Sequence, residues 1–145
     1  MKAITIRQPW AQLIVEGKRP YEIRTWVIDC PQDILVHSSK KVDTEACQRL
    51  GIDPSPLPIG SILGWVTVVE CIRFTEESWL RTRAEHLEWT AFDPNVYGWV
   101  LRDPRLLPHP VPWRGSLGLF DVPDDVISGS EPLEFVAAHA RLLSR

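Results

Sequence analysis

The sequence predicts an α+β fold, a small and mainly antiparallel β-barrel with short helices packed around it. About five or six segments have the apolar–polar alternation or the β-branched residues of strands, and about three or four short helical patterns interrupt them. Long helices do not follow the strands regularly, which disfavours a doubly wound parallel sheet. A length of 145 residues fits a single domain, residues 1–145, with a buried core.

The stretch from Ile4 to Trp26 is predicted to form a strand, a helix and a second strand. Ile4 to Arg7 alternates apolar and polar residues with the two-residue period of a half-buried strand. Pro9 suits the first position of a helix, where a backbone N–H has no intrahelical partner, and Gly17 ends that helix. The turn and strand that follow are crowded with ionisable side chains, namely Lys18, Arg19, Glu22 and Arg24.

The middle of the chain continues this mixed pattern. Its predicted elements are a strand at 34–39, a helix at 43–51, a proline-rich loop at 53–58 and a long strand at 61–74. Asp43 is expected to cap the helix and Gly51 to end it. Gly64 allows a bend or a bulge in the long strand.

The last part of the chain is predicted to complete the barrel at about Val122. Its expected elements are a helix from Thr75 to Trp89, a strand at 97–101, an extended non-helical passage through the prolines of 104–112, a strand at 116–122 and a C-terminal helix at about 132–143.

Charge is unevenly distributed along the chain, whose net charge is −3. Residues 1–41 hold seven Lys and Arg against four Asp and Glu, whereas the remainder has an excess of six acidic residues. An anionic ligand is therefore expected to be drawn to the first third of the chain. The alternative is an ordinary surface of solvated charges.

Composition and motifs narrow the class of protein further. Three cysteines without a CxxC pair favour a reducing compartment, and no apolar run approaches the length of a transmembrane helix. We therefore expect a cytoplasmic protein that does not enter a membrane. The sequence has no Walker loop, GxGxxG element, zinc-type Cys/His spacing or GxSxG elbow, so neither a metal nor a cofactor is expected.

The charged turn and strand after the first helix form the main candidate site. Glu22 and Arg24 lie two residues apart on a predicted strand, so their side chains share one face. A carboxylate beside an arginine holds its fork in one orientation, ready for a phosphate or a base edge. Glu22 also suits acceptance of a hydrogen bond from a base amino group. The alternative is a plain structural salt bridge.

A second group of polar residues closes the strand at 34–39, namely His37, Ser38, Ser39 and Lys40. If that strand neighbours the Glu22 strand, both groups converge on one cleft. The chain also has seven tryptophans, among which Trp10 is close to the charged turn in sequence. Core packing is their default role, and a stacking face for a base is the alternative.

Five stretches resemble the ASCH domain (activating signal cointegrator-1 homology) family, namely IRQPWAQLIVEGKRPYEIRTW, LVHSSKK, GSILGWVTVVEC, YGWVL and PVPWRGSLGLFDV. The resemblance extends to about Val122 and is strongest at the G-x-K-x-x-E-x-R signature after Q-P-W. It implies a fold similar to the PUA domain, a small closed β-barrel with a cleft beside the first helix. Family members are proposed to bind RNA or other nucleic acids there. Some small bacterial relatives are amidohydrolases of an acylated cytosine nucleoside, and others are proposed nucleases.

The match to the signature departs from the family at one key position. Gly17, Glu22 and Arg24 match it, but Arg19 occupies its lysine position, with Lys18 one residue earlier. A catalytic lysine needs an amine that can lose its proton, whereas arginine stays charged in proteins. The amidohydrolase branch also has a threonine where this chain has Glu22. The resemblance therefore favours binding over catalysis, because Arg19 still attracts anions.

The leading hypothesis is a binding module for RNA, another nucleic acid or a nucleotide-like small molecule. Its predicted binding residues are Gln8, Trp10, Lys18, Arg19, Glu22, Arg24, His37, Ser38 and Lys40. A second hypothesis is an enzyme, either a hydrolase of modified nucleosides such as N4-acylcytidine or a ribonuclease, with Glu22 as acid/base and Lys18 as activating cation. A third is a protein-interaction domain whose acidic part binds a basic partner. The oligomeric state stays open.

Overall fold

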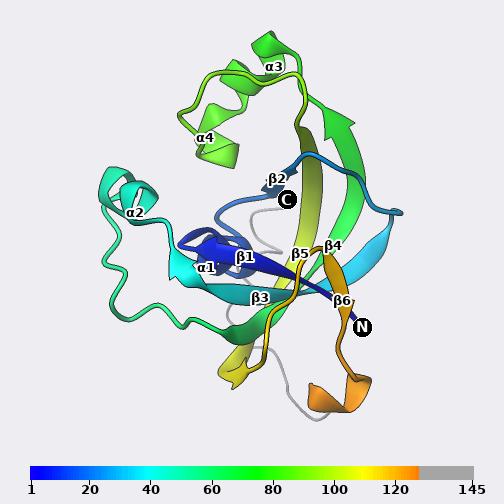
Figure 1. Cartoon of the computed structure of the whole chain (residues 1–145). Helices are drawn as coiled ribbons and strands as arrows, with labels where there is room; N and C mark the ends of the chain where they lie inside the picture. The colour runs from blue at the N-terminus through cyan, green and yellow to red at the C-terminus, as the bar shows by residue number, and fades with distance from the viewer. Residues whose placement is uncertain (128–145) are drawn as a thin grey trace.

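The protein, described here by a computed structural model of residues 1–127, is built on one six-stranded sheet (Figure 1). The strands lie in the order β2-β5-β4-β3-β1-β6. Their bounds are Lys2–Gln8 for β1, Tyr21–Arg24 for β2, Gln32–Val42 for β3, Ser61–Arg73 for β4, Tyr97–Pro112 for β5 and Leu119–Asp121 for β6. β1 and β3 are parallel, and the other four pairings are antiparallel. The α+β class is thus confirmed, with a mixed sheet.

The barrel that the sequence predicts is not closed by strand pairing within residues 1–127, because β2 and β6 remain at the edges of the sheet. β6 occupies the outer side of β1 from Lys2 to Ile4. At the next residue, the carbonyl oxygen of Thr5 accepts a hydrogen bond of 2.9 Å from Nη2 of Arg24 on β2. A side-chain bond therefore spans the gap where a closed barrel would pair backbones.

β5 includes the proline-rich passage that the sequence predicts to be merely extended. β2 pairs only with the first residues of β5, Tyr97 to Val100, so the later part of β5 has β4 as its single neighbour. Prolines are tolerated there because the other side of the strand needs no N–H donor. The register shifts on either side of Gly64, where a Cβ would lie 1.8 Å from the carbonyl oxygen of Arg105. The predicted irregularity at Gly64 is therefore confirmed.

Short helices surround the sheet. They are α1 (Trp10–Val15), α2 (Thr44–Leu50), α3 (Glu76–Arg81), α4 (Arg83–His86) and the 3-10 turn η1 (Asp124–Val126). Asp43 caps α2 by accepting from the Ala46 backbone N–H at 3.0 Å, Gly51 ends it, and Thr75 caps α3, as the sequence predicts. One helix predicted from Thr75 to Trp89 is instead two. These helices, together with the residues that follow α4 up to Thr90, are termed the α3–α4 lobe and lie at one end of the molecule (Figure 1).

The main core lies between α1 and the sheet. Trp10, Leu13 and Ile14 of α1 pack with Ile4 and Trp99 of the strands. This packing fixes the end of α1, where the charged turn begins. Within residues 1–127 no helix has the length and hydropathy to span a bilayer, and the helix predicted at about 132–143 lies outside the described residues.

Candidate functional site

The end of α1 turns Arg19 into the protein and leaves Lys18 outside. The Leu13 carbonyl accepts from the backbone N–H groups of Lys18 at 2.8 Å and Arg19 at 3.2 Å, and Gly17 adopts the positive φ of 77° at this turn. The Lys18 side chain is 64% exposed and pairs with Glu16 at 2.9 Å. Arg19 is only 2% exposed. Adjacent cations of the signature therefore have opposite environments.

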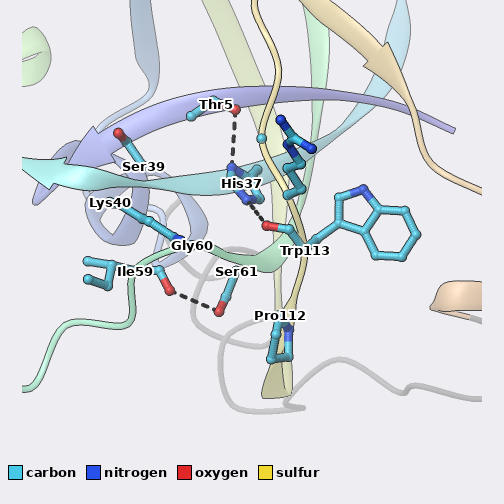
Figure 2. A pocket seen from close by; sticks show the side chains of 11 residues that line it. Thr5, His37, Ser39, Lys40, Ile59, Gly60, Ser61, Pro112 and Trp113 are labelled. Carbon is cyan, nitrogen blue, oxygen red and sulfur yellow. Dashed lines mark hydrogen bonds between the residues drawn. The ribbon is translucent and has the colours of Figure 1, made fainter.

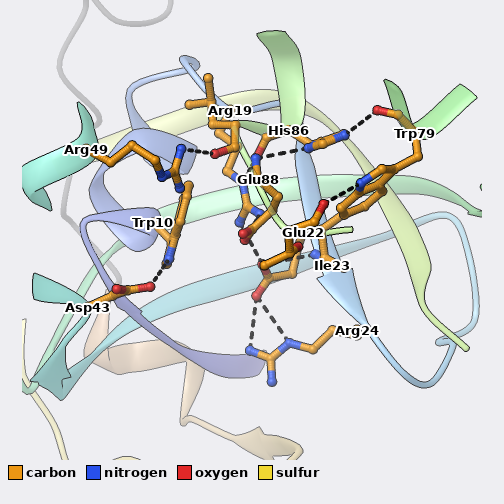
Figure 3. A network of polar contacts seen from close by, with 12 residues as sticks. Trp10, Arg19, Glu22, Ile23, Arg24, Asp43, Arg49, Trp79, His86 and Glu88 are labelled. Atoms are coloured by element: carbon orange, nitrogen blue, oxygen red, sulfur yellow. Dashed lines mark hydrogen bonds and ion pairs between the residues drawn. The ribbon is translucent and has the colours of Figure 1, made fainter. Parts of the chain in front are cut away.

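The Arg19 guanidinium is enclosed by an aromatic ring and three acceptors (Figure 3). Its Cζ lies 4.3 Å from the centre of the Trp10 ring. Nε donates to the His86 carbonyl at 2.8 Å, Nη1 to Glu22 Oε1 at 3.1 Å and Nη2 to Glu88 Oε1 at 3.1 Å. Burial lowers the pKa of Arg19, whereas the two carboxylates raise it. Arg19 stays cationic, and its charge is compensated inside the protein.

Glu22 joins two arginines through one buried carboxylate. Oε1 accepts from Arg19 and, at 3.2 Å, from the backbone N–H of Ile23, while Oε2 accepts from Nε of Arg24 at 3.1 Å. The predicted contact between Glu22 and Arg24 is thus confirmed. The Arg24 side chain is 26% exposed, so part of its fork faces solvent in an orientation that Glu22 restrains.

Two residues of the α3–α4 lobe close the network over Arg19. His86 Nε2 donates to the Trp79 carbonyl at 2.8 Å, and Nδ1 accepts from the Glu88 backbone N–H at 3.0 Å. Both ring nitrogens keep these roles only when the imidazole is neutral. Burial lowers the pKa of His86 and raises the pKa of Glu88. The lobe is therefore attached to the signature by polar contacts as well as by packing.

Two other predicted binding residues use their polar atoms within the protein. Gln8 is fully buried; Nε2 donates to the Pro58 carbonyl at 2.8 Å and Oε1 accepts from the Gln12 backbone N–H at 2.9 Å. Ser38 is also buried, and Oγ donates to the Ser61 carbonyl at 3.2 Å. Both residues hold the chain segments around the pocket described next.

A hollow of about 820 Å³, termed the β3 pocket, lies where β3 meets β1 and the ends of β4 and β5 (Figure 2). Its polar lining consists of two cations, Lys40 and Arg114, three hydroxyls, Thr5, Ser39 and Ser61, and the ring of His37. Among the described residues, no carboxylate lines it. In a chain with a net charge of −3, this is a local excess of positive charge.

His37 forms a fixed part of the pocket wall. Nε2 donates to the Trp113 carbonyl at 2.6 Å, and Nδ1 lies 3.1 Å from Oγ1 of Thr5. A Cβ at Gly115 would lie 2.8 Å from Cε1 of His37. The backbone after Trp113 therefore passes close over the imidazole, and glycine permits this approach.

The two groups of predicted residues meet only indirectly within the described chain. The strand of His37 does not neighbour the strand of Glu22, because β5 and β4 separate β2 from β3. The condition for one shared cleft is therefore not met. Thr5 links the two regions instead. Its carbonyl accepts from Arg24, and its hydroxyl contacts His37. Lys18 has neither a hydrogen bond nor an ion pair to Glu22, with which the enzyme hypothesis pairs it.

Sequence reasoning missed several residues of these two regions. They are Thr5, His86, Glu88, Arg114 and Gly115. The run Trp113-Arg114-Gly115 combines an aromatic residue, a cation and a glycine after a proline-rich passage. This pattern is the sequence feature that indicates Arg114 and Gly115 as site residues. Glu88 and His86 have no comparable local pattern, because their partner Arg19 lies almost seventy residues earlier in the chain.

Comparisons with known proteins agree with the fold. The model of the ASCH domain family matches residues 4–106, which include the charged turn and most of the β3 pocket. A search of curated proteins found no match. The crystal structure of ASCH from Zymomonas mobilis has a TM-score of 0.63 and 14% sequence identity, covering 92% of this chain and 97% of that chain.

Two variants of the Zymomonas mobilis protein are also similar. A tyrosine-to-phenylalanine mutant has a TM-score of 0.56 and 16% identity, covering 88% of this chain and 94% of that chain. A serine-to-alanine mutant has a TM-score of 0.59 and 15% identity, covering 90% and 96%. At such identities the likeness concerns the fold.

Proposed function

This chain belongs to the ASCH domain family, and we propose that it is a nucleic-acid-binding module whose expected ligand is RNA. Backbone phosphates bind in the β3 pocket, where Lys40 and Arg114 supply the positive charge. Arg24 of the signature donates to the carbonyl of Thr5, a residue that lines the pocket, and extends this surface. Binding of this kind depends strongly on salt, because each neutralised phosphate releases counterions.

The composition of the β3 pocket carries the proposal. Within residues 1–127, two cations and three hydroxyls line it without any carboxylate, although acidic residues outnumber basic ones in the whole chain. Among the described residues, neither Lys40 nor Arg114 forms an ion pair within the protein. Uncompensated cations suit a phosphate, which accepts charge-assisted hydrogen bonds from them. The Ser39 hydroxyl accepts from the Lys41 backbone N–H, so its own proton is left for such a ligand.

The signature contributes in a different way. Arg19 is enclosed by Glu22, Glu88 and Trp10, which supports a role in holding α1, β2 and the α3–α4 lobe together. Arg24 remains partly exposed and is oriented by Glu22. A restrained arginine loses less conformational entropy when it binds a phosphate or a base edge than a free one does.

The proposal is tested by fluorescence anisotropy with labelled single-stranded RNA, over salt concentrations from about 50 to 200 mM. We expect Lys40→Ala and Arg114→Ala each to weaken binding and to make the plot of log affinity against log salt less steep, by about 0.7 per lost phosphate contact. Lys2→Ala is the matched control, because it also removes one positive charge but lies outside the pocket, paired with Asp121 at 2.9 Å.

Two results would contradict the proposal. One is the absence of binding to single-stranded or duplex RNA and DNA at low salt. The other is an equal effect of Lys2→Ala and the two pocket variants, which would indicate attraction by overall charge without a specific site.

A further inference from the structure

Trp89 is a large aromatic side chain that the fold leaves in solvent. It follows α4 in the last part of the α3–α4 lobe, before the chain continues to β5, and it is 63% exposed. Six other tryptophans in the chain are less exposed, and Trp10, Trp79 and Trp99 are buried. An exposed indole forgoes the stabilisation that burial of its large apolar area would supply.

The loop that carries Trp89 is held by side chains from three directions. Arg49 of α2 donates to the Leu87 carbonyl at 2.9 Å. Arg83 of α4 donates to the carbonyls of Trp89 at 3.4 Å and Thr90 at 3.0 Å. The indole N–H of Trp79 donates to the Thr90 carbonyl. Glu88 accepts from Arg19 through its carboxylate and donates to His86 through its backbone N–H. Trp89 is therefore presented on an ordered backbone, which lowers the entropic cost of binding.

The two arginines that hold the loop also flank the ring. The Cζ atoms of Arg49 and Arg83 lie 5.9 and 5.6 Å from the centre of the Trp89 ring. These distances exceed the 4.3 Å between Arg19 and Trp10, where the guanidinium lies directly over the indole. Neither arginine covers Trp89 closely, which agrees with its high exposure.

We propose that Trp89 is a stacking platform for an unpaired base of the bound nucleic acid, with Arg49 and Arg83 attracting the adjacent phosphates. This inference rests on the proposed function and adds a second contact surface on the α3–α4 lobe. An aromatic face between cations suits single-stranded nucleic acid, because every base offers a face for stacking and every nucleotide brings a negative charge.

The position of Arg49 connects this surface to the signature. Arg49 lies between Trp89 and Trp10, with its Cζ 6.0 Å from the centre of the Trp10 ring. Arg19 lies over the same Trp10 ring. Cations and indoles thus alternate from the buried network to the surface, in the order Arg19, Trp10, Arg49, Trp89 and Arg83. The buried members support the exposed ones.

The test compares Trp89→Leu and Trp89→Phe with the wild-type chain, using labelled oligoadenylate RNA and a duplex RNA of the same length. We expect Trp89→Leu to weaken single-strand binding by about 5- to 150-fold, the range for loss of one stacked base. Trp89→Phe retains a ring and should lose less. The salt dependence of Trp89→Leu should equal that of the wild type, since the indole is uncharged.

Leu80→Ala is the matched control, because Leu80 is another exposed apolar side chain of the same lobe, 57% exposed. Its affinity should equal that of the wild type, and thermal unfolding should show that Trp89→Leu remains folded. Wild-type affinity in Trp89→Leu, together with weakened binding by Lys40→Ala, would overturn the platform and leave the proposed function standing. Base stacking would be overturned if Trp89→Leu lost affinity for duplex RNA to the same extent as for single-stranded RNA. It would also be overturned if Leu80→Ala lost as much single-strand affinity as Trp89→Leu. No binding by the wild type would overturn both proposals.

Discussion

The buried signature network and the β3 pocket both contain two cationic side chains and differ in how their charge is compensated. In the network, Arg19 and Arg24 share the Glu22 carboxylate, and Arg19 has Glu88 as a second partner. In the pocket, Lys40 and Arg114 have no carboxylate beside them in the lining that the described part of the chain provides. A buried charge without a partner is very unfavourable, whereas an exposed one is solvated by water.

This difference separates the two roles that a charged motif can have. The network holds α1, β2 and the α3–α4 lobe in one arrangement, so its charges act on the fold. The pocket leaves its charges for a partner outside the chain. The most characteristic residues of the family signature therefore contribute to stability here, and the proposed contacts with ligand come largely from residues outside the signature.

The largest expected effect comes from Arg19→Ala. The substitution leaves Glu22 and Glu88 without the guanidinium that compensates them, and breaking one partner out of a buried ion pair typically costs about 3–5 kcal/mol. We expect a loss of that size in the free energy of unfolding, measured by urea denaturation. Lys18→Ala is the control, because the exposed pair with Glu16 contributes at most about 1 kcal/mol. Equal losses in the two variants would remove the distinction between network and surface.

Arg24→Ala is expected to have an intermediate effect on stability and to weaken binding as well. Arg24 donates to Glu22 and to the Thr5 carbonyl across the open edge of the sheet, and hydrogen bonds that involve a charged group contribute about 1.5–3 kcal/mol each. Its partial exposure reduces this figure. Urea denaturation and RNA binding should both change. A change in stability alone would assign Arg24 to the buried network, and a change in RNA binding alone would assign it to the binding surface.

The pH dependence of stability tests the neutral state of His86. Burial lowers its pKa in the folded protein, so the unfolded chain takes up a proton first, near pH ~6.5. The free energy of unfolding should therefore fall as the pH decreases below ~6.5, by about 1.4 kcal/mol for each unit of pKa difference. The raised pKa of Glu88 acts in the opposite direction at lower pH, so the useful range is about pH 8 to 5.5.

His86→Gln provides the reference for this measurement. A glutamine amide offers a donor for the Trp79 carbonyl and an acceptor for the Glu88 backbone N–H, and it does not titrate. Its stability should vary less with pH than that of the wild type. An unchanged pH profile would show that another group causes the dependence.

The fold was predictable from sequence where the information is local. The caps Asp43, Gly51 and Thr75 and the break at Gly64 follow from the preferences of single residues for particular backbone conformations. The parallel pairing of β1 with β3 and the open edge at β2 depend on contacts between distant segments. Alternation of apolar residues shows which face of a strand is buried and does not show which strand lies beside it.

The candidate site shows the same limit. The contact between Glu22 and Arg24 follows from a spacing of two on one strand, and sequence analysis predicted it. The burial of Arg19 and the exposure of Lys18 depend on how the chain leaves α1 and on a carboxylate from the distant α3–α4 lobe. Composition identified the cations, and only the tertiary structure shows which of them are compensated.

The smallest expected effect on stability, in Lys40→Ala and Arg114→Ala, gives the sharpest contrast with Arg19→Ala. Both side chains are exposed and line a pocket to which residues 1–127 contribute no carboxylate, so removing one relieves repulsion from the other. We expect each variant to equal the wild type or to exceed it by a few tenths, at most about 0.5 kcal/mol, at low salt. The difference should vanish near 1 M salt, where the Debye length is about 3 Å. Lys2→Ala, which loses its pair with Asp121, should change in the opposite direction. A loss of more than about 1 kcal/mol in either pocket variant would mean that these cations support the fold, as Arg19 does.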